Sequence, residues 1–235
     1  MTHIVLGYDG SDFSMQALDW ALDEAELRKL PLLVAHAWQW PYGEADEEAK
    51  SHLRKAAEHV MWHGADCARQ SSAGVRVETD LYEGPAAGRL VELSHGAALI
   101  VVGSRGLSAL PRAVVGSVAG YVAAHAACPV IVVRGAGPLP ATAKPGPVVV
   151  PEREPEAPVL RFAFQEAAMR RLALAAHADL TAWAAGHPGV RIQPIAGHPA
   201  AGLMVVGRES AARGGAAGQL LQHAPCPVAV VGTVS

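Results

Sequence analysis

Val101-Val102-Gly103-Ser104-Arg105-Gly106 join an apolar run to a glycine-containing loop, and Gly116-Ser117 follow after nine further residues. Residues 98–102 form a short apolar run, as expected of a parallel strand that is buried on both faces. The glycines allow a sharp turn and the close approach of a ligand to the backbone. Gly116-Ser117 begin an alanine-rich helical stretch, so free N–H groups and the positive end of a helix dipole are expected beside the loop. Strand, loop and helix start together predict a phosphate-binding site.

Strand-like and helix-like segments alternate through the first 134 residues. This alternation predicts a parallel sheet with helices on both faces. A first strand is expected from Ile4, and further strands at 32–36, 75–79, 98–102 and 130–133. Helices are expected at 11–30, 47–70, 85–95 and 116–127.

The spacing Gly-x2-Gly-x9-Gly-Ser, followed by Cys128-Pro129 and an apolar strand, resembles the nucleotide loop and last strand of the universal stress protein family. The resemblance covers residues 1–134 and begins at 4–11, where the family has its first strand and an acidic residue at the strand's end. It implies a doubly wound, five-stranded parallel α/β sheet of strand order 3-2-1-4-5. The ligand crevice then lies between strands 1 and 4, where the strand order reverses.

The resemblance also implies which residues bind ATP, with or without Mg2+. Tyr8 and Asp9 would meet the ribose and adenine side, and the backbone of Ala37 would meet adenine. The positions that match the family's phosphate-binding residues are Gly103, Gly106, Gly116, Ser117 and Val118. Ala119 stands where nucleotide-binding members often carry a hydroxyl residue, so one contact to the terminal phosphate is missing.

Several other residues near this loop have two readings. Arg105 and Arg112 could pair with phosphates through charge-assisted hydrogen bonds, or be solvated loop residues. Trp38 and Trp40 could stack on a base, although aromatic side chains near strand ends more often pack in the core. Ser11 has no histidine partner visible in the sequence and no nucleophile-elbow context, so a catalytic serine is not expected.

Composition describes an ordinary soluble protein. The chain has 235 residues, 51% of them hydrophobic, a net charge of −3 and a pI near 6.4. It has no basic footprint of a nucleic-acid binder and no apolar run as long as a membrane span. The amino terminus leads directly into a strand, without room for a signal peptide, so the expected location is the cytoplasm.

Cysteines and histidines do not predict a disulfide framework or a metal site. The three cysteines are widely spaced, and both Cys128 and Cys226 precede strands, as small buried side chains do. His59, His63 and Cys67 recur every four residues and would share one helix face. Successive steps nevertheless advance about 6 Å along the axis, so three such ligands converge poorly on one zinc or copper ion. An exposed or interface helix face is the expected alternative.

A second, shortened copy of the same pattern follows a proline- and glycine-rich linker at 135–147. The copy occupies residues 148–235, and four segments of it repeat segments of 1–134: 148–150 repeats the first strand, 199–202 repeats 85–88, 205–207 repeats 101–103, and 226–228 repeats 128–130. The offset between matching residues falls from 144 at Ile4 to 98 at Cys128. The falling offset means that the second copy lacks residues at the long second helix, at the third helix and in the phosphate loop.

Binding residues are also lost from the second copy. Pro151 takes the place of Gly7, Arg153 that of Asp9, and Ser210 that of Gly106. Glu209 would in addition repel a phosphate. The second copy is therefore predicted not to bind nucleotide.

Two expectations concern the arrangement of strands in and between the copies. Strands predicted at 180–184 and 190–195 are separated by five residues, too few for a parallel crossover, so 190–195 is expected to run antiparallel to its neighbour. By resemblance to tandem family members, the copies are expected to form an intramolecular pseudo-dimer, with 129–133 antiparallel to 227–231. A homodimer of the whole chain is left open.

Three functions are compatible with these residues. The first is an adenine-nucleotide-binding protein of stress response or signalling, whose ligand sets its conformation or its binding to an unidentified protein partner. The second is a nucleotide-independent scaffold of the same fold. The third is slow ATP hydrolysis. A faster enzyme is not expected, because the chain has no Walker lysine motif and no clear acid–base pair.

Overall fold

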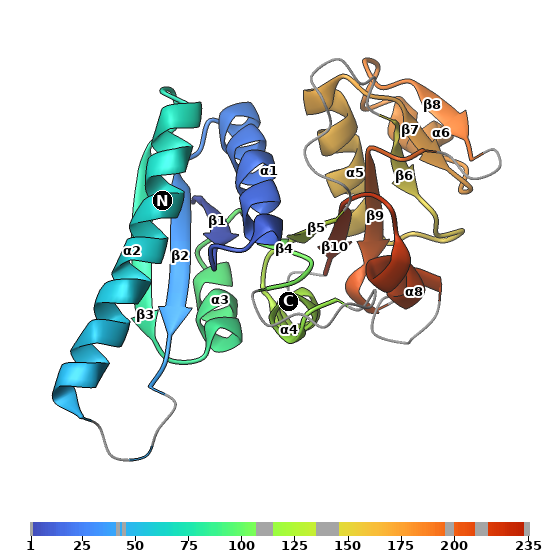
Figure 1. Cartoon of the computed structure of the whole chain (residues 1–235). Helices are drawn as coiled ribbons and strands as arrows, with labels where there is room; N and C mark the ends of the chain where they lie inside the picture. Colours follow the sequence, from blue (N-terminus) through green and yellow to red (C-terminus); the bar gives the residue numbers. More distant parts are fainter. Residues whose placement is uncertain are drawn as a thin grey trace. The chain divides into compact units, whose positions relative to one another are not determined.

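The computed structural model of the chain describes residues 2–40, 43, 46–106, 115–134, 146–195, 200–209 and 216–232. The chain divides into two compact units, Met1–Val133 (unit 1) and Arg134–Ser235 (unit 2). Figure 1 traces both units along the chain. Most of the expected linker lies outside the described residues, and the pseudo-dimer remains a prediction.

Unit 1 is a five-stranded parallel sheet in the order β3-β2-β1-β4-β5. Its strands are β1 (Ile4–Gly7), β2 (Leu32–Trp38), β3 (Val77–Glu83), β4 (Leu99–Gly103) and β5 (Val130–Val133). The predicted order 3-2-1-4-5 is confirmed. The central strands are apolar because helices cover both of their faces, whereas β3 at the border of the sheet carries Glu78 and Asp80.

Four helices cover the sheet of unit 1: α1 (Asp12–Arg28), α2 (Glu47–Ser71), α3 (Ala86–Ser94) and α4 (Ser117–His125). Helices α1 and α2 contact each other, as do α3 and α4, which is the pairing of a doubly wound sheet (Figure 1). Ser11 caps α1 by accepting a hydrogen bond from the Ser14 amide at 3.2 Å. Helix α1 therefore begins directly after β1, and its first turn lies beside the end of that strand.

Unit 2 repeats this plan in the order β10-β9-β6-β7-β8, again with parallel pairs. Its strands are β6 (Val148–Val150), β7 (Leu174–Ala176), β8 (Ile192–Pro194), β9 (Leu203–Gly207) and β10 (Val228–Val231), and its helices are α5 (Ala157–Arg170), α6 (Thr181–Ala184) and α8 (Ala216–His223). Helices α1 and α5 end alike: Glu24 pairs with Arg28 as Glu166 pairs with Arg170, both carboxylates being buried. These matching helix ends support the correspondence of the two copies.

The prediction of an inverted strand in unit 2 is wrong. Residues Thr181–Ala184 form helix α6, and the second strand of the unit is β7, which lies earlier in the chain. The crossover therefore runs from His177 to Arg191, long enough for a parallel pair, and β8 pairs with β7 in parallel from Leu174↔Ile192. The error came from reading the apolar residues of α6 as a strand and passing over the alanine-rich β7.

Helix α6 takes the place of the long second helix, whose loss was predicted. Asp179 accepts hydrogen bonds from the amide and the hydroxyl of Thr181 at 2.9 and 2.6 Å, and these bonds lower its pKa. Trp183 and His187 both stack on Phe164 of α5, with ring centroids 5.9 and 4.5 Å away. An aromatic cluster thus covers part of the sheet with far fewer residues than α2 uses.

Candidate functional site

The candidate site of unit 1 lies where β1 and β4 end, and we call it the β1/β4 site: Asp9, Gly103–Gly106 and the start of α4. The two strands are in register from Ile4↔Leu99 to Gly7↔Val102. The residues that follow them therefore leave the sheet side by side. The chain leaves β1 through α1 toward β2 and leaves β4 through α4 toward β5 on the other side, so the strand order reverses at this point. Doubly wound sheets bind ligands at such a position.

Asp9 connects the first turn of α1 to the glycine loop. Its Oδ1 accepts hydrogen bonds from the Ser11 amide at 3.0 Å and from the Ser11 hydroxyl at 2.6 Å. Its Oδ2 faces Gly106, where an added Cβ would lie only 2.5 Å from that oxygen. The hydrogen bonds from Ser11 and the contact with Gly106 are compatible, because each uses a different oxygen of Asp9.

Gly103 is required by packing. A Cβ at this position would lie 2.6 Å from the backbone oxygen of Phe13 in α1. Gly103 was expected to let a ligand approach the backbone. Its packing against α1 is a simpler reason for a glycine at this position. Gly106 differs, because its neighbour is the Asp9 carboxylate rather than backbone.

Helix α4 begins against this loop. The Gly116 amide donates a hydrogen bond to the Ser104 carbonyl at 2.8 Å, and Gly116 is the N-cap residue without a side-chain cap. The amides of the first turn, at Ser117 and Val118, therefore belong to the positive end of a helix with no capping oxygen. Ala119 in the same turn is 3% exposed, so its methyl group is buried.

Arg105 lies over the ring of Phe13, with its guanidinium carbon 5.2 Å from the ring centroid. Its Nε is buried and has no hydrogen-bond partner in the part of the chain that the structure describes. This geometry favours the phosphate-pairing reading over a solvated side chain, because a held guanidinium with a spare donor suits an anion. Arg112 lies outside the described residues.

Tyr8 turns its side chain away from the loop and toward α2. Its hydroxyl lies 2.9 Å from His63 Nδ1, and its ring packs so closely on Gly64 that a Cβ there would be 2.6 Å away. Burial raises the pKa of Tyr8, and nearby Cys67 and Asp9 raise it further. The backbone of Tyr8 is engaged as well: its amide donates to the Ala35 carbonyl at 2.9 Å, and its carbonyl accepts a hydrogen bond from His36 Nδ1 at 2.8 Å.

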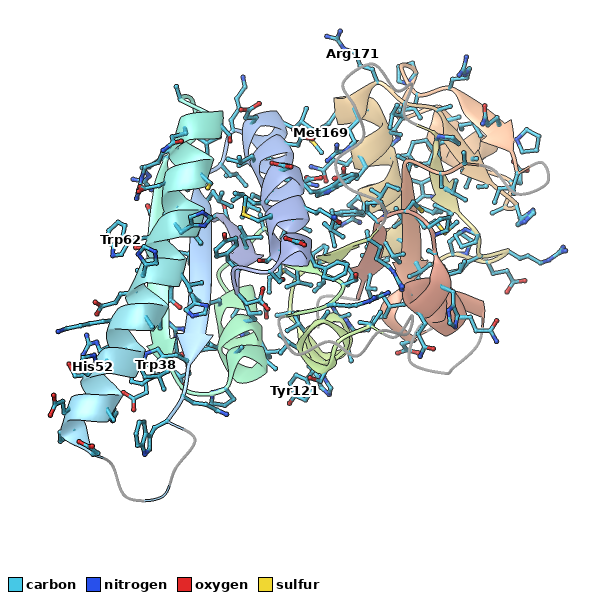
Figure 2. All side chains as sticks on the ribbon, viewed as in Figure 1. Trp38, His52, Trp62, Tyr121, Met169 and Arg171 are labelled. Atoms are coloured by element: carbon cyan, nitrogen blue, oxygen red, sulfur yellow. The ribbon has the colours of Figure 1, made fainter. Side chains whose placement is uncertain are left out.

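His36 is a residue that sequence reasoning missed, although a histidine inside an apolar strand was visible. It precedes Ala37, which lies in β2 opposite Tyr82 of β3. Trp38 is 8% exposed, and its carbonyl accepts from the Gly84 amide at 2.8 Å, which joins the ends of β2 and β3. These contacts support the packing reading of Trp38, which is labelled in Figure 2.

His59 and His63 of α2 are exposed and Cys67 is half-buried, so these side chains lie on an exposed face of the helix. His63 contacts Tyr8 through Nδ1, and its Nε2 lies 3.8 Å from Cys67 Sγ. Within the described ranges, no three His, Cys, Asp or Glu side chains are grouped so that they could hold a metal ion. A search of the same ranges finds no helix with the length and apolarity needed to span a membrane.

The corresponding place in unit 2, the β6/β9 site, is built from different residues. Glu152 Oε1 accepts a hydrogen bond from the Gly207 amide at 2.8 Å. Arg153 and Glu209 are exposed, and Ser210 lies outside the described residues. The contact of Glu152 had no signal in the sequence, because it joins residues 55 positions apart.

Comparison with known proteins places these features in one family. A model of the Universal stress protein family matches residues 1–134. Universal stress protein Rv2624c of Mycobacterium tuberculosis is 30% identical over 98% of this chain and 96% of its own length. A universal stress protein structure from Archaeoglobus fulgidus is similar over 98% of this chain and 96% of that chain, with a TM-score of 0.74 and 18% identity, and it shows the fold of both units.

The solved structures that this chain resembles include nucleotide complexes. A universal stress protein in complex with cAMP is 26% identical and covers 57% of this chain and 97% of its own, with a TM-score of 0.45. The family model and the Mycobacterium relative decide the assignment: this chain belongs to the universal stress protein family.

Proposed function

We propose that unit 1 binds one adenine nucleotide per chain, ATP in the first place, at the β1/β4 site. The observation that carries the proposal is the packing of Gly106 against Asp9 beside the uncapped start of α4. Bare backbone and a helix N-terminus meet there at the end of two parallel strands. Such an arrangement binds phosphate through N–H groups and the helix dipole.

The charges of the site favour one orientation of the bound nucleotide. Arg105 and the amides of Ser117 and Val118 supply donors for phosphates, together with the backbone at Gly103 and Gly106. Gly116 contributes by keeping the start of α4 free of a side chain, because its own amide donates to the Ser104 carbonyl. The Asp9 carboxylate would repel a phosphate but can accept a hydrogen bond from a ribose hydroxyl. The nucleoside then extends toward the ends of β1 and β2, where the backbone of Tyr8 and Ala37 lies.

Mg2+, where it accompanies ATP, would be held mainly by the phosphates. Asp9 is assigned to the sugar end of the nucleotide, so the other ligands of the ion would be water molecules, which Mg2+ usually keeps. The nucleotide would act as a signal that changes conformation or partner binding in a stress response. Slow hydrolysis of ATP is the one enzymatic activity that we propose for this site.

A nucleotide-independent scaffold is the second candidate, and Ala119 favours it. Its methyl group is buried in the first turn of α4, so no side-chain hydroxyl is available from this position to a terminal phosphate. The remaining backbone donors suit binding in the micromolar range or weaker, about 8 kcal/mol or less.

Calorimetric titration of ATP into the full chain tests the proposal, together with analysis of nucleotide that co-purifies. We expect a stoichiometry of one, and release of inorganic phosphate measured on the same sample reports any hydrolysis. No binding at millimolar ATP and no co-purified nucleotide would support the scaffold. A stoichiometry of two would show that unit 2 also binds.

A further inference from the structure

Glu152 lies at the ends of the central strands of unit 2. It follows Pro151 just after β6, and its carboxylate reaches the amide of Gly207 at the end of β9, with Oε1 and N 2.8 Å apart. Gly207 is buried, so its amide cannot rely on water for an acceptor. The contact therefore satisfies a backbone donor at the centre of the β6/β9 site.

The strand pairing of the two units differs at the place where this donor lies. In unit 1 the β1–β4 register continues to Gly7↔Val102, whereas in unit 2 the equivalent β6–β9 register ends at Val149↔Met204. Pro151 stands in the place of Gly7, and proline has no N–H to donate to a strand ladder. The parallel ladder of unit 2 is shorter at the end where a ligand would bind, and the Glu152 carboxylate bridges the strands beyond it.

A carboxylate is a strong substitute for a ladder carbonyl. An ionised acceptor forms a shorter and stronger hydrogen bond to an N–H group than a neutral one does. It also places a negative charge at the strand ends, near where a phosphate or ribose would approach in a binding copy. A second anion would be repelled from the same place.

We propose that the Glu152 carboxylate is the built-in anionic ligand of unit 2. It holds the ends of β6 and β9 together and keeps the β6/β9 site closed to nucleotide. Unit 2 then needs no bound ligand to complete its sheet, whatever unit 1 binds. The inference is independent of the proposed function, because it concerns only contacts inside unit 2.

Gly207 itself is not demanded by sterics. A Cβ there would lie 3.5 Å from Glu152 Oε1 and 3.6 Å from Val159, which is ordinary contact. The relevant property of this position is therefore its amide, and the exchange of that amide with solvent measures the proposed bond directly.

Hydrogen exchange followed by NMR on the full chain tests the proposal with Glu152→Ala and Glu152→Gln. Glu154→Ala removes the same charge from an exposed neighbour and is the matched control. We expect the Gly207 amide to exchange on the order of tenfold faster in Glu152→Ala, with Val230 of β10 as an unchanged internal reference. Glu152→Gln keeps an acceptor oxygen, so its effect should be smaller, and it serves as the test variant if Glu152→Ala does not fold.

Three results would overturn the proposal. The first is unchanged Gly207 exchange in both Glu152 variants. The second is an equal acceleration in Glu154→Ala, which would assign the effect to net charge. The third is slower Gly207 exchange in the wild-type chain when ATP is added, because a closed site should not respond to nucleotide.

Discussion

The β1/β4 site and the β6/β9 site occupy equivalent places in two copies of one fold, and they differ in what satisfies the strand ends. In unit 1 the ladder runs to Gly7↔Val102 and Asp9 lies against Gly106. In unit 2 the ladder ends at Val149↔Met204 and Glu152 reaches across to Gly207. Each site has a carboxylate near a glycine: that of Asp9 accepts hydrogen bonds from Ser11, whereas that of Glu152 accepts one from the strand residue Gly207.

A glycine at the end of the fourth strand of a copy is therefore weak evidence that the copy binds nucleotide. Gly103 is required by the backbone of Phe13, and its counterpart Gly207 persists in the copy that carries its own carboxylate. Gly106 separates the copies better, because its position opposite Asp9 depends on the loop itself. Loop chemistry, rather than strand-end glycine, should therefore decide which copy binds.

The largest expected effect comes from filling the loop of unit 1. In Gly106→Val the new side chain would collide with Asp9 Oδ2, and Asp9 cannot move without losing its two bonds from Ser11. ATP affinity should fall at least about 100-fold, or about 2.7 kcal/mol, as measured by calorimetry.

Gly74→Val is the control for this substitution, because nothing lies within 4 Å of a Cβ at Gly74. Asp9→Ala should weaken ATP less than Gly106→Val, since it removes one contact at the sugar end and leaves the loop open. Equal affinity of Gly106→Val and wild type would remove the loop from the site.

A smaller loss is expected from Arg105→Ala. A charge-assisted hydrogen bond from Arg105 to a phosphate contributes about 2 kcal/mol, so ATP should bind roughly 30-fold more weakly while adenosine is little affected. Titrations of both ligands at two salt concentrations measure this difference. Arg54→Ala changes the same charge on an exposed part of α2 and should leave ATP affinity unchanged. If both variants bound ATP as the wild type does, Arg105 would be a packing residue held by Phe13.

Alkaline pH should destabilise unit 2 through Cys226. Burial raises the pKa of this thiol from 9.0 to about 11, so the unfolded chain loses its proton first as pH rises. The stabilising contribution is complete below pH 9 and is lost between about pH 9 and pH 11, amounting to roughly 3 kcal/mol. Urea unfolding across this window should show a steeper loss for the wild type than for Cys226→Ala. Parallel pH curves for the two proteins would contradict the assignment.

The smallest effect is expected from restoring the second glycine of unit 2. Ser210→Gly should leave ATP stoichiometry at one, because the loop remains shortened and Glu152 still holds the Gly207 amide. Calorimetry beside the wild type checks this. A second binding event in Ser210→Gly would show that one residue alone separates the two copies.

Sequence patterns predicted the elements that have strong periodicity. The strand order of unit 1, the start of α1 at Ser11 and the start of α4 at Gly116-Ser117 are as expected. Each depends on local chemistry: apolar runs in buried strands, a capping hydroxyl, or a glycine before a helix. The ends of β1 and β4 lie side by side, as the predicted strand order requires.

The features that escaped prediction depend on contacts between distant residues. Strand β7 is too short and alanine-rich to show a strand pattern, and it is fixed by pairing with β6 and β8. The ring of Tyr8 lies on Gly64 of α2, and Glu152 reaches Gly207, in both cases about 55 residues along the chain. Local propensity carries no information about such pairs.

Strand β8, which terminates the sheet order of unit 2, has a consequence for assembly. It is three residues long and ends at the exposed Pro194, whose nitrogen cannot donate to a further strand. Long, flat border strands are templates for intermolecular strand addition and aggregation, and short strands with proline resist it. The shortened copy has therefore lost its long covering helix, while its border strand β8 remains a poor template for strand addition.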